Sequence, residues 1–214
     1  QIDNQNGLPQ CLGKLGPTPF GNLDVVTERF DGIPVCTAAE DQRNPRAAYD
    51  GMNGVIVVWE DFRNDPTMAV AEIYAQRIDL ATGRPDPAWP VNGVAVCQTG
   101  YHAERPRIAG TVDGAYMTWI DYRNDPGYAP RDRDIYVQYI NSATATWPPA
   151  PTNWTGNGIP VATNQPPDQI NPELAVDNIF TLDLLGNLTQ GVVVTYQDDR
   201  YPGATFGTPV WSVF

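Results

Sequence analysis

Acidic and basic residues two positions apart recur along this chain. An Asp-x-Arg pair occurs as Asp61/Arg63, Asp121/Arg123 and Asp198/Arg200. Residues two apart on a β-strand point to the same face, so each carboxylate can meet its guanidinium. The pairs could line a ligand site, or they could form a repeated internal ion pair that ties a strand end to the adjacent loop. Since catalytic residues usually occur once and structural residues recur, we expect structural repeat pairs and no catalytic residue.

The loops after the first two pairs are rich in oxygen ligands. They contain Asn64-Asp65-Pro66 and Asn124-Asp125-Pro126, and Glu72 and Asp134 follow. Ca²⁺ takes about six to eight oxygen ligands, which makes Asp65, Asp125 and Asp134 calcium candidates. Asn-Asp-Pro is also a turn sequence, in which Asn and Asp bond their own backbone. Because no Asp-x-Asp-x-Asp-Gly loop is present, we expect turns here and no cofactor.

Signatures of other chemistry are sparse. His102 is the single histidine and has no nucleophile motif near it, so neither a catalytic triad nor a histidine metal cluster is expected. Glycosidases need two carboxyl groups, and the acids that stand out from the repeated pattern are Glu60, Glu173 and Asp199. Exposed tryptophans in Pro-rich loops could stack on sugars or anchor the loops; these are Trp89, Trp147 and Trp154. Together they support an alternative function in glycan binding or cleavage.

The composition excludes several partners. The 214 residues include 13 basic and 25 acidic side chains, a net charge of −12. Such a surface repels phosphate backbones and anionic lipid, so we expect no nucleic acid. No run of about eighteen apolar residues is present, so no membrane insertion is expected. The polar start at Gln1 suits a mature secreted protein, and we expect an extracellular or cell-surface location.

The three cysteines are Cys11, Cys36 and Cys97. Cys36 and Cys97 hold equivalent places in two repeats, where they are expected to be small buried side chains. Stacked copies are too far apart for those two to pair, so Cys11 with Cys36 is the candidate disulfide. Metal or redox chemistry is not supported because no Cys-x-x-Cys motif occurs.

A repeating unit positions all these residues. Gly32 to Gly93 is 61 positions and Gly93 to Gly158 is 65. Each unit predicts a short first strand after a proline (46–49, 107–110, 173–176), a strong second (54–62, 114–122, 191–197), a third (72–78, 134–140, 208–214) and a short fourth (93–97, 158–162). Helical periodicity is absent. The continuous apolar run of the second strand indicates burial on both faces, and we expect Trp59, Trp119 and Tyr196 there to pack between units.

The pattern Trp-x-Asp-x-Arg, then Asp/Glu-Ile-Tyr-x-Gln, then Gly-Val-x-Val resembles the repeats of secreted bacterial β-propeller-like proteins. The resemblance covers about residues 22–214 and implies an all-β fold of four-stranded propeller blades. The third copy departs from it, with Tyr196 in place of Trp and an insertion around 180–190.

The expected layout is an N-terminal extension (1–21), a half-blade (22–43), blade 1 (44–104), blade 2 (105–170) and an incomplete blade 3 (171–214). The chain could be a segment of a longer polypeptide, its half-blade could be completed by a neighbouring chain, or the copies could form an open stack. Unpaired strand edges template further pairing, so the expected partners are other chains or the rest of a longer polypeptide, and glycans in the alternative.

Repetition, acidity and low lysine content together predict an extracellular non-catalytic β-repeat module with a structural, adhesive or assembly role. The alternative is a glycan-binding or glycan-cleaving β-propeller. Asn153 and Asn187 begin Asn-x-Thr sequons, which carry glycans only where the machinery exists.

Overall fold

The computed structural model describes residues 33–124, 133–147, 156–162, 168–182, 188–198 and 210–213. The strands of the first part are β1 (Gln42–Tyr49), β2 (Gly54–Asp61), β3 (Glu72–Asp79), β4 (Arg84–Pro85) and β5 (Val94–Cys97). Those of the second are β6 (Ala103–Gly110), β7 (Gly114–Asp121), β8 (Asp134–Asn141) and β9 (Ile159–Ala162). The third has β10 (Gln169–Leu182), β11 (Leu188–Asp198) and β12 (Val210–Val213). Within these ranges no helix forms, and hence none that could cross a membrane.

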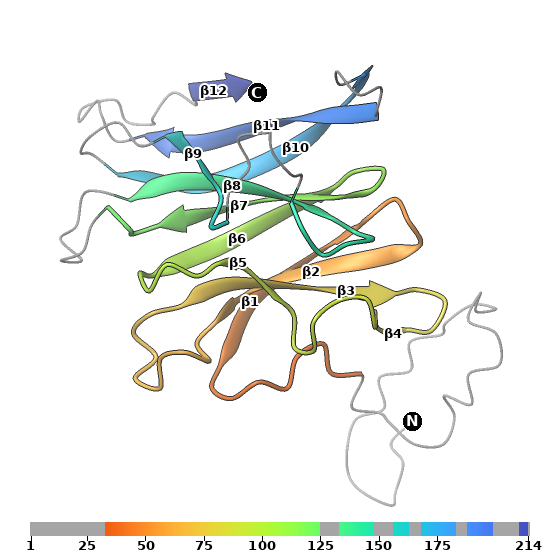
Figure 1. The fold of residues 1–214 in the computed structure, drawn as a ribbon. Helices are drawn as coiled ribbons and strands as arrows, with labels where there is room; N and C mark the ends of the chain where they lie inside the picture. Colours follow the sequence, from red (N-terminus) through yellow and green to blue (C-terminus); the bar gives the residue numbers. More distant parts are fainter. Residues whose placement is uncertain are drawn as a thin grey trace, which may run out of the picture.

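The strands form three antiparallel sheets that follow the order of the chain. Sheet 1 is β1-β2-β3, with β4 and β5 both paired to β3; sheet 2 is β6-β7-β8-β9; sheet 3 is β10-β11-β12. Figure 1 shows the three sheets stacked one above another, with sheet 1 at the bottom of the view and sheet 3 at the top. The expected all-β class and the four-strand order within a unit are therefore confirmed for sheets 1 and 2.

Two details differ from the expectation. Residues 33–36, at the end of the expected half-blade, form no strand, because no strand lies beside them among the described residues. The insertion near residue 180 does not lengthen a turn. Phe180 lies opposite Gln190 and Leu182 opposite Leu188, so the inserted residues extend the β10–β11 hairpin instead.

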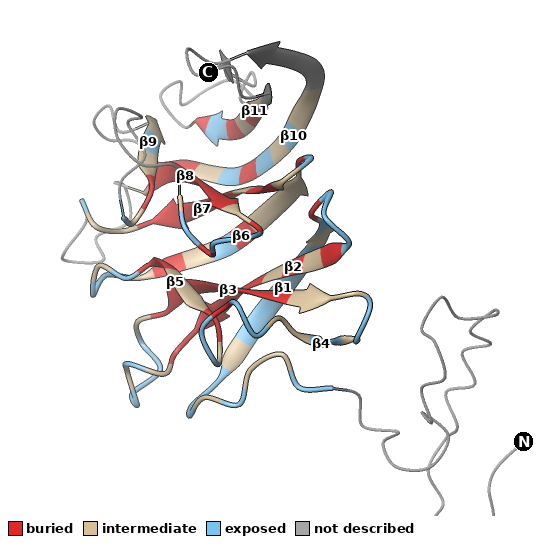
Figure 2. Ribbon diagram, turned by 45° about the vertical axis from the view of Figure 1, so that its right-hand side comes forward, coloured by how far each residue is buried: buried red, intermediate tan, exposed pale blue. Residues whose placement is uncertain are grey.

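Alternating side chains of the central strands form the core between sheets. From sheet 1, Ile56 and Val58 join a cluster with Met117 and Trp119 of sheet 2, all 0% exposed. The opposite face of sheet 2 packs Ile120, Ile135 and Val137 against Val192, Val194 and Tyr196 of sheet 3. Figure 2 shows this burial between the sheets, whereas β1 is mostly exposed. Sheet 2 is therefore covered on both faces, by sheet 1 on one side and by sheet 3 on the other.

The first strands share a bulge. The residue before each proline has positive φ: Asn44 (52°), Arg105 (54°) and Asn171 (52°). The register of the strand pairs shifts at the same three places. A bulge bends a strand and increases its twist, so the three copies share a backbone geometry as well as a sequence pattern.

Candidate functional site

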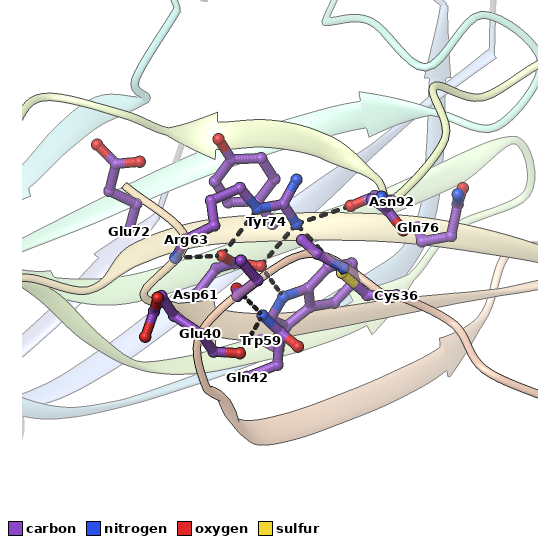
Figure 3. A network of polar contacts seen from close by, with 12 residues as sticks. Cys36, Glu40, Gln42, Trp59, Asp61, Arg63, Glu72, Tyr74, Gln76 and Asn92 are labelled. Atoms are coloured by element: carbon purple, nitrogen blue, oxygen red, sulfur yellow. Dashed lines mark hydrogen bonds and ion pairs between the residues drawn. The ribbon is translucent and has the colours of Figure 1, made fainter. Parts of the chain in front are cut away.

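The first Asp-x-Arg pair lies where β2 ends. The Asp61 side chain is 0% exposed and that of Arg63 16%. Arg63 donates from Nε to Asp61 Oδ1 (2.8 Å) and from Nη2 to Oδ2 (2.6 Å), and its backbone N–H donates to Oδ1 (2.9 Å). Figure 3 shows this two-pronged pair at the centre of a polar network. Bidentate Arg–carboxylate pairs are among the strongest polar contacts in proteins.

Two aromatic rings enclose the pair. Trp59 Nε1 donates to Asp61 Oδ2 at 2.6 Å, and the Arg63 guanidinium lies 3.8 Å from the centre of the Tyr74 ring. Trp59 and Tyr74 stack at 6.5 Å between centroids. The indole N–H therefore has a partner where the ring is 3% exposed, and the guanidinium gains a cation–π contact.

Arg63 also joins two chain segments that are distant in sequence. Its Nη2 donates to the backbone carbonyl of Asn92 (2.8 Å) and to the Sγ of Cys36 (3.3 Å). Asn92 in turn accepts from the backbone N–H of Thr37 through Oδ1 (2.8 Å). The network thus connects the segment before β1, the end of β2 and the loop before β5 (Figure 3).

Sheet 2 repeats this arrangement atom for atom. Arg123 donates to Asp121 at 2.8 and 2.7 Å, to the Asn157 carbonyl at 2.7 Å and to Cys97 Sγ at 3.4 Å. Trp119 Nε1 donates to Asp121 Oδ2 at 2.9 Å.

The rest of the first network also has its counterpart. The Arg123 guanidinium lies 3.7 Å from the Tyr136 ring centre, and Gln98 N donates to Asn157 Oδ1 at 2.6 Å. Because Cys97 and Gln98 come from sheet 1 and Arg123 from sheet 2, this network bridges two sheets. We call each such set, a Trp, Asp, Arg, Tyr, Asn and Cys, an interface module.

Sequence reasoning missed the asparagine of each module. Asn92 and Asn157 have φ of 67° and 73°, and the glycines after them have φ of 89° (Gly93) and 76° (Gly158). A Cβ on Gly158 would lie 2.5 Å from Trp119 Cη2. Two successive positive φ angles favour Asn-Gly, so the repeated dipeptide before each fourth strand was the available signal.

Charge and burial act against each other within the modules. Burial alone would lower the pKa of Arg63 and of Arg123, but the hydrogen bonds and charge of Asp61 and Asp121 outweigh it, and both pKa values are raised. Both arginines therefore stay cationic, and they lack the proton-transfer capacity of a catalytic acid or base at neutral pH. In the third copy Asp198 is buried at the end of β11, while Arg200 lies outside the described residues.

Glu60, which the glycosidase alternative needs, is 5% exposed and bound on both oxygens. Its Oε1 accepts from the backbone N–H of Arg105 (2.7 Å) and its Oε2 from Asn44 Nδ2 (2.9 Å), which links β1 to β6. Glu173 is 65% exposed and pairs with Arg107 at 2.9 Å. Asp199 lies outside the described residues.

His102 lies between sheets 1 and 2. Its Nδ1 accepts from the backbone N–H of Ala71 at 3.0 Å, and its Nε2 lies 3.7 Å from Glu104 Oε2. The contact with His102 lowers the pKa of Glu104, which also accepts a hydrogen bond from the Tyr122 hydroxyl. Burial, followed by the charge of Glu104, raises the pKa of Tyr122 to about 12. The histidine therefore connects sheets.

The calcium candidates bond to their own chain. Asp65 accepts from the Thr67 hydroxyl (2.6 Å) and from the backbone N–H groups of Thr67, Ala69 and Val70 (2.9, 2.9 and 2.7 Å). These bonds, the hydroxyl first, lower the pKa of Asp65 to about 2. Asp134 is buried and accepts from Asn124 Nδ2 at 2.6 Å. Asp125 lies outside the described residues. Where side chains are described, no group of three or more His, Cys, Asp or Glu residues could hold a metal ion.

Cys36 and Cys97 were expected only to be small buried side chains, but the thiols of both also contact the arginines of the interface modules. Cys36 is half-buried, whereas burial was expected, and Cys97 is buried. The Sγ of Cys36 accepts from Arg63, and Cys97 Sγ lies 3.3 Å from Asp121 Oδ2. Burial and then the charge of Asp121 raise the pKa of Cys97. Cys11 lies outside the described residues, so a count of free thiols in the unfolded, unreduced protein is the test of a Cys11–Cys36 bond.

The loop tryptophans separate into two roles. Trp89 is 3% exposed and donates from Nε1 to the Ser142 carbonyl at 2.8 Å, which anchors a sheet 1 loop on sheet 2. Trp147 is half-buried, and Trp154 lies outside the described residues.

A second buried charge cluster was not anticipated. In sheet 1, Arg77 donates to Asp50 (2.5 Å), to Asp86 and to the Met52 carbonyl (2.6 Å). The Asp50 side chain is 0% exposed. Sheet 2 has Tyr139 at the matching place, whose hydroxyl donates to Asp113 at 2.6 Å. This cluster differs between sheets 1 and 2, whereas the interface module is the same in both.

A cavity of about 250 Å³ opens on the outer face of sheet 1. Its lining is mostly apolar and comprises Val35, Cys36, Gln42, Pro45, Val57 and Trp59. It therefore adjoins the first interface module and lies on the side of sheet 1 away from sheet 2.

Comparison with known proteins adds little to the site. No protein-family model matches the chain, and no curated protein matches it. Among solved structures, the chain is similar to an endo-arabinase from Bacteroides thetaiotaomicron, with 15% identity and a TM-score of 0.38. The match covers 79% of this chain and 55% of the other, so the chain spans about half of that enzyme's length. We therefore base the function on the geometry of the site itself.

Proposed function

We propose that this chain is a non-catalytic β-repeat module whose three sheets are successive blades of a β-propeller-like stack. It acts as a structural, adhesive or assembly component at a cell surface. Its partners are other chains, or the remainder of a longer polypeptide, that meet it through strand edges.

The repetition of the interface module carries this proposal. The same polar groups lie at the end of β2 and of β7, and the matched Arg–Asp distances agree within 0.1 Å, at 2.8 and 2.6 Å against 2.8 and 2.7 Å. Each arginine bonds an aspartate, a backbone carbonyl and a thiol that belong to the chain itself. These groups stabilise the junctions between copies, and their hydrogen bonds are already used for that purpose.

Glu60 and Glu173, two acidic residues that stand out from the repeated pattern, support the same conclusion. A general acid or base needs access to substrate and a suitable proton affinity. Both oxygens of Glu60 are taken by donors that join two strands. Glu173 is accessible, and it lies on the first strand of sheet 3 paired with an arginine. Neither has the surroundings of a catalytic carboxyl.

A glycan screen tests the proposal. The purified chain is incubated with a panel of plant and bacterial polysaccharides, and released reducing ends are measured. We expect no turnover above a boiled control. Turnover that is lost in Glu60→Gln or Glu173→Gln, and kept in the exposed Glu40→Gln control, would establish the glycosidase alternative instead.

Location is tested separately. If the protein is displayed at the surface, a protease added to intact cells removes it while cytoplasmic markers survive. Survival of the protein until the cells are lysed would contradict the cell-surface part of the proposal.

A further inference from the structure

The first strands of the three sheets lie side by side and carry charged residues at one repeat position. β6 lies beside β1 and beside β10, and a Cβ on Gly110 of β6 would lie 1.7 Å from the carbonyl oxygen of Tyr49 in β1. Directly after the proline of each first strand come Arg46 in β1, Arg107 in β6 and Glu173 in β10. We call these three residues the charged row.

The two arginines of the row are held alike, but only one of them has a carboxylate. Nη1 of Arg46 donates to the Pro45 carbonyl at 3.0 Å, and Nη1 of Arg107 donates to the Pro106 carbonyl at 3.3 Å. Nε of Arg107 also donates to Glu173 Oε1 of the next sheet at 2.9 Å. The residue at the matching position of the sheet next to Arg46 is Arg107 itself. The repeat therefore sets a guanidinium beside Arg46 where Arg107 has a carboxylate.

Arginines without a counter-charge are notable in a chain with 25 acidic and 13 basic side chains. Among the described arginines, Arg46, Arg84 and Arg105 form no ion pair. Arg46 and Arg105 are exposed, and Arg105 lies two residues before Arg107 and donates to Asn171 Oδ1 of β10 at 2.9 Å. Neighbouring guanidinia repel each other, and an anion placed between them removes that repulsion. This part of the surface therefore suits an anionic ligand.

The surroundings of the row are polar. Asn171 is exposed, and its Nδ2 donates to Gln197 Oε1 at 2.5 Å. Of the large apolar side chains that are exposed in the described structure, only Tyr49 lies on a first strand, and it points to the opposite face of β1 from Arg46 because the two are three residues apart. Protein interfaces depend on buried aromatic and aliphatic anchors, which the row lacks. Amides and guanidinia suit sugar hydroxyls and carboxylates instead.

We propose that the charged row binds the carboxylate groups of a uronate-bearing polysaccharide. One ligand carboxylate bridges Arg46 and Arg107 and competes with Glu173 for the second of them. A planar guanidinium holds a carboxylate through two parallel hydrogen bonds. This inference rests on the proposed non-catalytic function and gives its adhesive role a ligand class.

Isothermal titration calorimetry with a short oligogalacturonate tests the row. The titration is run at about 0.15 M salt, because screening over about 8 Å then weakens the long-range repulsion between the ligand and the acidic chain. We expect the oligogalacturonate to bind and its fully methyl-esterified form, which has the same sugars without the charge, not to bind.

Substitutions in the row separate local contacts from net charge. Arg46→Gln and Arg107→Gln should each weaken binding about tenfold, as expected for loss of a hydrogen bond between charged groups. Arg84→Gln removes the same charge from an exposed arginine of β4 and should leave binding unchanged. Glu173→Gln removes the competing carboxylate and should tighten binding, whereas Glu40→Gln, at another exposed glutamate, should not.

Several results would overturn the inference. They are an oligogalacturonate that does not bind, equal binding of its methyl ester, equal losses in Arg46→Gln and Arg84→Gln, or weaker binding by Glu173→Gln. Poly-glutamate that binds at least as tightly as the oligogalacturonate would show that the row recognises an acidic peptide and not a glycan. Circular dichroism verifies that each variant is folded. If Arg107→Gln does not fold, the result for the exposed Arg46 decides.

The two proposals fail separately. Absence of binding together with absence of glycan turnover removes the charged row as a site and leaves the non-catalytic function standing. Release of reducing ends by a chain whose binding still depends on Arg46 does the reverse.

Discussion

Replacing Asp121 with Ala tests whether the interface module stabilises the stack. The Asp121 side chain is 0% exposed and accepts from Trp119 Nε1 and from three N–H groups of Arg123. Its removal leaves the guanidinium, 19% exposed, without its counter-charge in the sheet 1–sheet 2 junction. Breaking a buried pair in this way costs about 3–5 kcal/mol. We expect about 3 kcal/mol, since solvent reaches part of Arg123.

The chain contains its own control for this substitution. Asp41 and Arg43 have the same Asp-x-Arg spacing and a contact of 2.6 Å, but their side chains are 53% and 47% exposed. Exposed pairs contribute about 0–1 kcal/mol, so Asp41→Ala should change the free energy of unfolding by less than about 1 kcal/mol. Urea unfolding followed by tryptophan fluorescence gives both values, provided that the slopes with denaturant agree.

A double variant isolates the buried charge. If the unpaired guanidinium causes most of the loss, Asp121→Ala combined with Arg123→Ala is more stable than Asp121→Ala alone. The reasoning is refuted if Asp121→Ala costs no more than Asp41→Ala, or if the two module substitutions simply add.

Three further predictions follow from positions with distinct physical constraints. Gly158→Ala should lower the free energy of unfolding by about 1–3 kcal/mol more than Gly100→Ala, as measured by chemical denaturation. Both glycines have φ of +76°, but only a Cβ at position 158 would meet Trp119. Burial would raise the pKa of Asp50, but hydrogen bonds from Arg77 and then from backbone N–H groups hold it below 3.8. The folded state therefore binds fewer protons than the unfolded state, so stability falls as the pH drops below about 4. The urea midpoint of Asp50→Asn should depend less steeply on pH than that of the wild type, and an equally steep dependence would contradict the reasoning. The Cys97 thiol, 1% exposed and with a raised pKa, should stay unmodified by a thiol reagent until the protein unfolds; rapid labelling of it in the folded state, seen by peptide mass mapping, would contradict the burial.

The strands were predictable because each copy repeats a strong local pattern. Apolar runs, flanking turn residues and the matched Trp-x-Asp-x-Arg placed β2, β3, β7 and β8 within one or two residues of their observed ends. The ion pairs were predicted from strand geometry, but Arg63 and Arg123 lie in the turns after β2 and β7, where each backbone N–H also donates to the aspartate. These features depend on local sequence.

The contacts that join copies were harder to predict. Asn92 and Asn157 each accept hydrogen bonds in the module through both the side-chain Oδ1 and the backbone carbonyl. The Arg63–Cys36 contact joins residues 27 positions apart. Periodicity does not encode which loop reaches which arginine. Glu60 also looked like a candidate acid, and its role as a link between β1 and β6 depends on the bulge at Asn44.

The central claim is that copies of one sheet stack through the same tryptophan–aspartate–arginine junction. Hydrogen exchange of the indole N–H groups of Trp59 and Trp119 tests it most directly, with resonances assigned by Trp→Phe variants. Both indoles donate to a buried carboxylate, and the rings are 3% and 0% exposed. We predict slow exchange for both. Exchange of either at the rate of a solvent-exposed indole would contradict the account.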